Sequence, residues 1–318
     1  MLSCLAPTGC SGVQSALDPA GEEARQILGI FQAMLVGGMA IWLCVIVLLL
    51  YAIRQNRRRF GEAASSRLIL WAGGIFPAAT LFLLLAFGLW QMPSLRPAAQ
   101  AATADGLRIE VTGRQFWWNV VYRTPDGSPI VSANEIRLPV GERVELLLKS
   151  DDVIHSFWIP ALAGKVDMIP GRTNRLSLLA TKQGDFRGPC AEYCGESHTF
   201  MAFSAIAMEP AAFRQWLDAK ARPSAGIGRD GERLFIRNGC GACHRVAGSA
   251  AQGTIGPDLS HLGSRTTLGA GILPNTEETI ARFIADPGAI KPGAKMPAFN
   301  MLPPEDIEAI AAYLKGLR

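Results

Sequence analysis

The chain has 318 residues, of which 49% are hydrophobic and 18% charged, and its formal net charge is +4. This length allows two or three domains. The positive surplus lies in residues 54–67, which hold five arginines and one glutamate, whereas residues 98–222 hold 14 basic and 14 acidic side chains and residues 226–318 hold 10 and 9. Because neither long segment is strongly basic, the charge distribution argues against nucleic-acid binding.

The N-terminal segment, residues 1–25, looks like the end of an export signal. Its run Leu5-Ala-Pro-Thr-Gly9-Cys10 resembles the site at which a lipoprotein signal is cleaved and its cysteine acylated. The charged and apolar parts that usually precede such a site are missing. We therefore predict an exported segment with a lipidated Cys10, and an ordinary short leader is the alternative.

Two long stretches without charge follow, residues 26–53 and 68–95. A helix needs about 20 apolar residues to cross the hydrocarbon core of a membrane. The short loop between the two stretches is rich in arginine, which marks the cytoplasmic side. We expect a transmembrane helical hairpin over residues 26–96 in the inner (plasma) membrane, with all later residues on the periplasmic or outer side.

The pattern then changes to short strands. A Pro- and Ala-rich linker at 92–104 precedes alternating runs at 107–112, 136–138 and 144–148, with turn signals such as 125–127 between them. Short strands separated by turns predict an all-β sandwich or barrel. We expect this domain to cover residues 98–222 and to end in a short helix at 211–221.

A compact set of metal-ligating side chains lies in this segment. Cys190, Cys194, His198 and Met201 fall within 12 residues, and His155 lies about 35 residues upstream. Thiolate, thioether and imidazole together favour copper. Two cysteines and two histidines can hold two copper ions if the thiolates bridge both metals, with Met201 and a backbone carbonyl as weak axial ligands. A disulfide and a zinc site are the alternatives, but zinc gains little from a nearby methionine.

Residues 98–216 resemble the copper domain of cytochrome c oxidase subunit II, through the runs at 152–158, 167–172 and 190–201. With the hairpin included, the resemblance covers residues 20–216. It implies a cupredoxin-like fold with a dinuclear copper centre, CuA. In that family the cysteines bridge the metals, the histidines are terminal ligands, and a backbone carbonyl and a methionine are axial. The ligands that the resemblance implies here are Cys190, Cys194, His155, His198, Met201 and the carbonyl of Glu192. It also implies that the Glu192 carboxylate binds magnesium at the interface with subunit I.

A second linker at 223–228 separates this domain from a helical segment, residues 226–318. Cys240-Gly-Ala-Cys243-His244 is the attachment motif for haem c, although a redox-active pair of cysteines shares part of it. Met296 lies 52 residues after His244, and His/Met ligation suits an electron-transfer haem. Helix patterns at 230–238, 276–286 and 303–314 complete what looks like a small all-α class I cytochrome c.

Both centres would have filled coordination spheres, and we find no nucleophile or acid–base pair, so the sequence indicates electron relay. The resemblance implies a subunit of a respiratory cytochrome c oxidase, an oxidoreductase and translocase, that passes electrons from haem c to CuA and on to subunit I for oxygen reduction and proton pumping. Its partners would be subunit I, subunit III and an external electron donor such as a cytochrome. The subunit of a CuA-type nitric oxide reductase is the main alternative. A quinol oxidase subunit lacks the copper ligands, and a free-standing carrier would not need the hairpin.

The family also indicates where electrons reach CuA. Its members that use soluble cytochrome c have an aromatic run with a tryptophan over the copper site. Alignment of residues 113–118 on that run places Phe116 at this position, and a slip of one residue would place Trp117 there. We predict that the fused haem is the obligatory electron donor to CuA; the alternative is that it is one of two routes.

Overall fold

The computed structural model describes residues 10–55, 61–91, 106–123, 129–224 and 229–318. The chain divides into two compact units, one of residues 26–101 and the other of residues 1–25 together with 102–318. Several predicted features lie outside the described residues: the signal-like residues 1–9, the arginines at 57–59, the linker at 92–104, the turn at 125–127 and most of the linker at 223–228.

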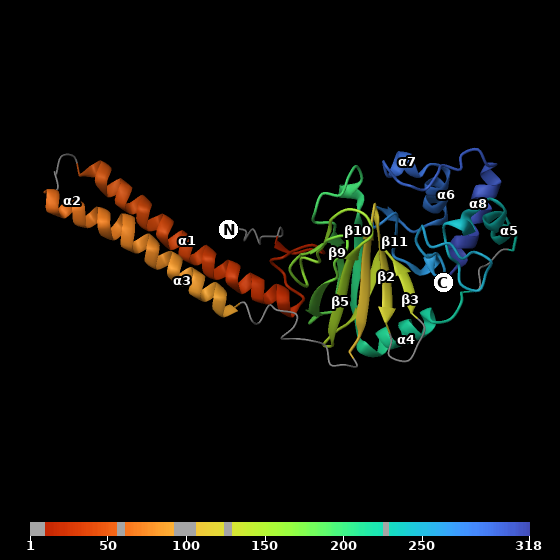
Figure 1. Cartoon of the computed structure of the whole chain (residues 1–318), viewed down its shortest axis with the longest axis horizontal. Helices are drawn as coiled ribbons and strands as arrows, with labels where there is room; N and C mark the ends of the chain where they lie inside the picture. Colours follow the sequence, from red (N-terminus) through yellow and green to blue (C-terminus); the bar gives the residue numbers. More distant parts are fainter. Residues whose placement is uncertain (1–9, 56–60, 92–105, 124–128, 225–228) are drawn as a thin grey trace, which may run out of the picture. The chain divides into compact units, whose positions relative to one another are not determined.

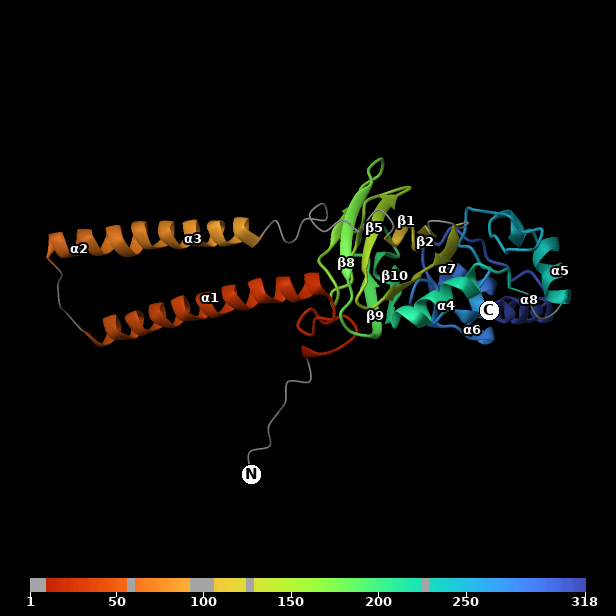
Figure 2. The same ribbon diagram turned by 90° about the horizontal axis from the view of Figure 1, so that it is seen from below.

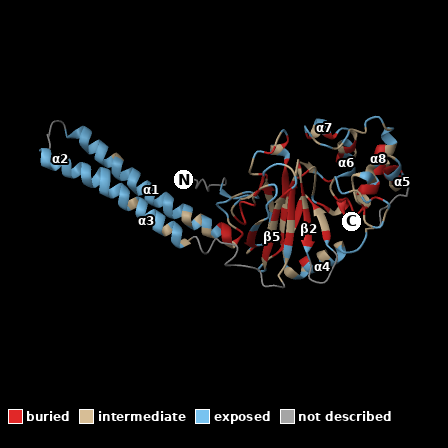
Figure 3. Cartoon of the chain, in the orientation of Figure 1, coloured by how far each residue is buried: buried red, intermediate tan, exposed pale blue. Residues whose placement is uncertain are grey.

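The first unit is helical (Figure 1). Helix α1 (Glu22–Arg54) covers the first predicted span, and α2 (Glu62–Leu68) continues through a π-helical segment (Ile69–Ile75) into α3 (Phe76–Gln91). These two stretches, of 33 and 30 residues, are long and apolar enough to cross a membrane, and their most apolar windows contain no buried residue (Figure 3). A surface so apolar needs a lipid or protein environment to cover it.

The second unit contains a β-sandwich whose five-stranded sheet has the order β3-β2-β1-β5-β8 and whose three-stranded sheet has the order β4-β10-β9. A further pair, β6-β7, lies beside them. The larger sheet consists of β3 (Ile130–Ala133), β2 (Trp117–Arg123), β1 (Arg108–Arg114), β5 (Arg143–Ser150) and β8 (Asn174–Leu179). The other strands are β4 (Glu135–Pro139), β10 (Ala202–Met208), β9 (Gly184–Pro189), β6 (His155–Phe157) and β7 (Val166–Met168).

The core of this domain is formed by alternate residues of both sheets, such as Leu146 and Leu148 of β5 in the larger sheet and Ala205 and Ala207 of β10 in the smaller one, which are buried. Alternation along a strand places these side chains on one face, and Figure 3 shows the buried strands as a continuous layer. Helix α4 (Pro210–Lys220) closes one end by packing Phe213 against Tyr122.

Residues 10–25 form an N-terminal arm on the sandwich. The backbone N–H of Ala20 donates to the carbonyl of Ala161 at 2.7 Å, and Gly21 bridges Ala180 beyond the end of β8. The buried carboxylate of Glu23 is paired with Arg143 of β5 at 2.5 Å and accepts the N–H of Leu179 at 3.1 Å. The arm therefore belongs to the fold of the sandwich. Cys10 is exposed at its start, and its lipidation stays a prediction.

The C-terminal part contains the helices α5 (Arg229–Arg237), α6 (Glu277–Ala285), α7 (Pro287–Ile290) and α8 (Pro304–Gly316). Helix α8 packs against α5 and α6 around a separate hydrophobic core (Figure 2). The three-part architecture expected from the sequence is confirmed: two apolar helices, a β-sandwich and a small helical domain.

Candidate metal centres

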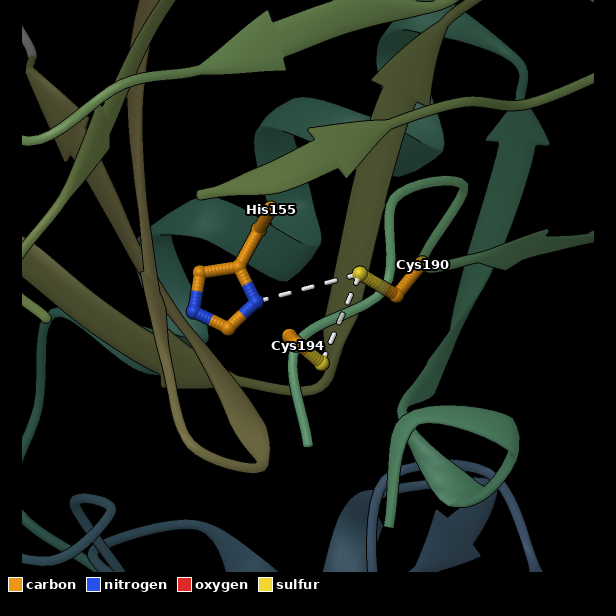
Figure 4. Close-up of side chains that lie close together, drawn as sticks. All are labelled: His155, Cys190 and Cys194. Atoms are coloured by element: carbon orange, nitrogen blue, oxygen red, sulfur yellow. Dashed lines mark hydrogen bonds between the residues drawn. The ribbon is translucent and has the colours of Figure 1, made fainter. Parts of the chain in front are cut away.

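The predicted copper ligands come from two segments at one end of the sandwich, the start of β6 and the connection between β9 and β10. His155 begins β6, Cys190 directly follows β9, and Met201 directly precedes β10. Between them, the segment 190–201 turns back on itself and carries Cys194 and His198, the latter at the start of a 3-10 turn. Figure 4 shows His155, Cys190 and Cys194 pointing toward one another.

The side chains of this loop meet at short distances. The Sγ atoms of Cys190 and Cys194 lie 3.9 Å apart. His155 Nδ1 is 3.8 Å from the sulfur of Cys190, and His198 Nδ1 is 3.6 Å from the sulfur of Cys194. The Sδ atom of Met201 lies 3.8 Å from the sulfur of Cys194. The structure therefore gathers all five side chains around one point, and the two cysteines and Met201 are buried.

The two thiols are chemically coupled. The hydrogen bond between them lowers the pKa of Cys190 to about 4, and the same contact raises the pKa of Cys194. The contact therefore favours the thiolate form at Cys190 and the protonated form at Cys194. Binding of a metal between the two sulfur atoms must release the remaining proton, because thiolates are the ligating form.

A neighbouring carboxylate sets the orientation of His155. Its Nε2 atom lies 2.8 Å from Asp152 Oδ1, so the ring donates its proton there and leaves Nδ1 free to ligate. Asp152 is itself held by the backbone N–H groups of Gln115 at 2.7 Å and Val153 at 2.8 Å. Such outer contacts orient a metal-binding imidazole. Behind the ring is Gly113, where an added Cβ would lie 2.7 Å from His155 Cδ2.

Glu192 lies beside the cysteine cluster through its backbone carbonyl. Its carbonyl oxygen lies 3.2 Å from the sulfur of Cys190, and its carboxylate points away, 3.7 Å from the ammonium group of Lys165. Gln115 stabilises the same loop by donating from its side-chain amide to the carbonyl of Cys194 at 2.7 Å.

The donor set suits copper. A metal bound to two thiolates at about 2.3 Å each spans up to about 4.6 Å between the sulfur atoms, and the observed 3.9 Å lies within that reach. The thioether of Met201 is a soft ligand of the kind copper prefers. Cys190, Cys194 and Met201, with the two histidines, would therefore be the residues that hold copper here.

The predicted haem ligands lie in the helical domain. Cys240 begins a short 3-10 turn after α5, and Cys243 and His244 follow it. His244 Nδ1 donates to the carbonyl of Pro257 at 2.8 Å, which leaves Nε2 available for iron. Cys240 and Met296 both pack against the core of this domain. Cys240 and Cys243 would tether a haem, and His244 and Met296 would be the side chains available to its iron.

The two aromatic residues predicted to receive electrons differ in environment. Phe116 is 6% exposed and precedes β2, whereas Trp117, the first residue of β2, is partly exposed beneath the guanidinium group of Arg114. The buried Trp118 lies against His155, with ring centroids 6.0 Å apart. Phe116 is covered by residues of the helical domain, which the sequence pattern did not predict.

Some site residues were missed from the sequence. Asp152 orients His155 from three positions earlier in the chain, and this short spacing could have indicated the contact. Gly113, Gln115 and Lys291 act through contacts between distant parts of the chain, and no local pattern distinguishes them.

Comparison with known proteins defines the family. Residues 126–208 match the family described as cytochrome c oxidase subunit II, periplasmic domain, and residues 228–318 match cytochrome c. Cytochrome c oxidase subunit 2 of Alkalihalophilus pseudofirmus is 31% identical over 325 residues, covering 98% of this chain and 93% of the relative. The Bacillus subtilis protein of the same name is 34% identical, covering 67% of this chain and 63% of the relative.

Among solved structures, the periplasmic domain of subunit II of the cytochrome oxidase of Bradyrhizobium japonicum is 31% identical, with a TM-score of 0.35, and covers 37% of this chain and 96% of that one. The relatives carry the oxidase name, so nothing in them favours the nitric oxide reductase alternative. This chain belongs to the cytochrome c oxidase subunit 2 family and is a membrane-bound electron-transfer subunit of an oxidase complex, with a cytochrome c domain joined to its copper domain.

Proposed function

We propose that this subunit passes electrons from haem c, bound through Cys240, Cys243, His244 and Met296, to CuA and from there to subunit I. The observation that carries the proposal is the convergence of two thiols, two imidazoles and a thioether within 4 Å of their neighbours. When bound, the copper and haem supply reversible one-electron chemistry.

The residues of the chain serve this role by holding the ligands still. Asp152 fixes the ring of His155, Gln115 fixes the carbonyl of Cys194, and Pro257 fixes the ring of His244. Rigid ligands lower the reorganisation that accompanies each electron transfer. The enclosing apolar core keeps water from the sulfur atoms of Cys190 and Cys194, which are 6% and 3% exposed.

The proposed topology is a hairpin with the copper and haem domains on the periplasmic side. The contact between the arm residue Ala20 and Ala161 supports this topology, because the two residues must be on the same side of the membrane to meet. The chain would then cross the membrane twice between these two residues. The basic residues Arg54 and Arg67 beside the connecting loop favour a cytoplasmic position for that loop.

The proposal extends to partners. Subunit I would receive the electrons, with Glu192 as a magnesium ligand at its surface, and subunit III would complete the complex. The external electron donor would be a cytochrome or a protein of similar chemistry that reduces haem c.

Isolation of the complex with its partner subunits tests this function. We expect two copper ions and one covalent haem per subunit, oxygen uptake, and no comparable reduction of nitric oxide. Cys190→Ser should abolish the mixed-valence copper signal and leave haem attachment intact, whereas Cys44→Ser, a change within α1, should leave both intact. Zinc at the site, a single copper ion, or nitric oxide reduction as the main activity would contradict the proposal.

A further inference from the structure

The loop that leads to the predicted haem ligand Met296 lies against the loop that carries the copper ligands. This docking loop, Lys291–Gly293, follows α7 and belongs to the same compact unit as the copper domain. Ser197, between Cys194 and His198, donates from Oγ to the carbonyl of Pro292 at 2.5 Å. The two metal-binding loops are therefore joined directly.

The docking loop also fits closely in shape. Gly293 has a φ of +72°, a backbone conformation that favours glycine. A Cβ at this position would lie 2.7 Å from Glu196 Oε2 and 3.3 Å from Phe116 Cε2. The backbone of the haem domain can approach the copper-ligand loop because a side chain is absent here.

Lys291 is the polar centre of this contact. It is 4% exposed, and its Nζ atom donates to the carbonyl of Phe116 at 2.6 Å and to the carbonyl of Gly269 at 2.9 Å. The first carbonyl belongs to the copper domain and the second to the haem domain. Lys291 therefore joins the two domains through their backbones.

Burial of an ammonium group is costly unless polar partners replace its water. Among the described residues, no carboxylate lies within ion-pair distance of Lys291. Burial accordingly lowers its pKa to about 7. The two carbonyls are available together only when the domains are in contact, so the position of Lys291 depends on their association.

Other contacts fix the rotation of the haem domain about this point. Thr266 donates from its backbone N–H and its hydroxyl to Glu135 Oε2, at 2.9 and 3.0 Å. Ala202, the residue after Met201, donates its N–H to the carbonyl of Ala270 at 3.0 Å. Arg114 donates to the carbonyl of Thr254 at 2.8 Å. Separated contacts of this kind define one orientation.

We propose that Lys291 is a positioning residue that anchors the haem domain on the copper domain in the orientation in which electrons pass between them. This inference rests on the proposed function. It makes the haem domain a docked donor with a defined contact, rather than a domain that reaches the copper site by diffusion on its linker.

Lys291→Met in the assembled oxidase tests the anchor. Haem c is reduced rapidly by a photoexcited ruthenium complex, and the reduction of CuA is followed by its near-infrared absorption. We expect the transfer to be about tenfold to a hundredfold slower, because a smaller fraction of molecules holds the competent orientation. Hydrogen exchange at residues 195–197 and 291–293 should increase. The copper paramagnetic spectrum and the haem absorption should not change.

Lys315→Met is the matched control. Lys315 also donates to two backbone carbonyls, those of Gly263 at 3.1 Å and Asn275 at 2.7 Å, but both lie within the haem domain. Its loss should lower the stability of that domain without slowing transfer to copper. Ser197→Ala removes the hydrogen bond from the copper-ligand loop to the carbonyl of Pro292, and it should also slow electron transfer from haem to copper.

The outcomes separate the two proposals. Transfer in Lys291→Met as fast as in Lys315→Met, with unchanged exchange at the docking loop, would overturn the anchor while leaving the relay intact. Absence of haem-to-copper transfer in the unaltered oxidase would overturn the relay itself, and the anchor with it.

Discussion

At the residue scale, the position of His155 is set by Asp152 on one side and by the lack of a side chain at Gly113 on the other. The carboxylate determines which ring nitrogen faces the thiols, and the glycine gives the ring its space. Neither residue is a ligand, yet both decide whether a ligand is correctly placed.

Asp152→Asn should weaken copper binding about 10- to 100-fold, because the imidazole loses the carboxylate that orients it. Copper competition with a chelator measures the effect. Asp151→Asn is the matched control, since the neighbouring Asp151 is half-exposed and pairs with Arg114 at 2.7 Å. Equal copper affinity in the two variants would show that Asp152 does not orient the ligand.

Gly113→Ala should displace the ring of His155, because the new Cβ would lie 2.7 Å from Cδ2 and 3.0 Å from Cγ. Overpacking of this kind costs about 1–3 kcal/mol, and we expect reduced copper content with normal haem content by metal and haem analysis. Gly29→Ala in α1, where no atom lies within 4 Å of the added carbon, serves as the control. Full copper occupancy with an unaltered paramagnetic spectrum would contradict this expectation.

At the scale of elements, the N-terminal arm contains a buried ion pair, made by Glu23, and an exposed ion pair, made by Glu22. Glu23 is 6% exposed and pairs with Arg143, and Glu22 pairs with Arg25 one helical turn away at 3.4 Å. The two neighbouring glutamates therefore provide a comparison of a buried with an exposed pair in the same helix turn.

Glu23→Gln should destabilise the arm by about 2–4 kcal/mol, because a buried charge loses its partner. Glu22→Gln should cost less than about 1 kcal/mol. Hydrogen exchange of residues 20–24 and of β8 in the purified complex measures the difference. If both variants exchange alike, the buried pair contributes no more than the exposed one.

Local patterns predicted many of these elements because their cause is local. The alternating runs at 107–112 and 144–148 correspond to β1 and β5, and the proline-led pattern at 303–314 corresponds to α8. The pairing of strands could not be predicted, since β1 lies between β2 and β5 through contacts that no short window contains. The arm was missed for the same reason: its partners lie more than a hundred positions away, as Glu23 and Leu179 do.

The candidate site likewise combines residues that local patterns predict with residues that only long-range contacts bring together. Cysteine, histidine and methionine at close spacing mark a metal loop by themselves, and the cytochrome motif is five residues long. Lys291 and Phe116 are 175 positions apart, so their contact became visible only in the folded chain. Lysines on helical domains are usually solvated, and nothing in the sequence near Lys291 indicates burial.

At the scale of the whole molecule, the copper domain has no charge surplus with which to attract a basic cytochrome. Residues 98–222 hold 14 basic and 14 acidic side chains, so electrostatic steering of a soluble donor should be weak. A donor that is part of the same chain does not depend on such steering.

Deletion of residues 223–318 should therefore lower oxygen uptake about tenfold or more with soluble cytochrome c as donor, because the docked domain is lost and steering does not replace it. Steady-state oxygen consumption measures the loss, with metal analysis to verify that copper is retained. Near-normal uptake in the truncated oxidase, with little response to salt, would show that the copper domain accepts electrons unaided.

The arm has a consequence for biogenesis. The chain is synthesised from its N-terminus, so Glu23 is made long before Leu179, which lies 156 positions later. The arm can meet Leu179, at the end of β8, only after the ribosome has delivered both apolar helices and the strands from β1 to β8. The arm must therefore wait without this partner while those segments are made, and we expect it to join the sandwich only once β8 has been synthesised.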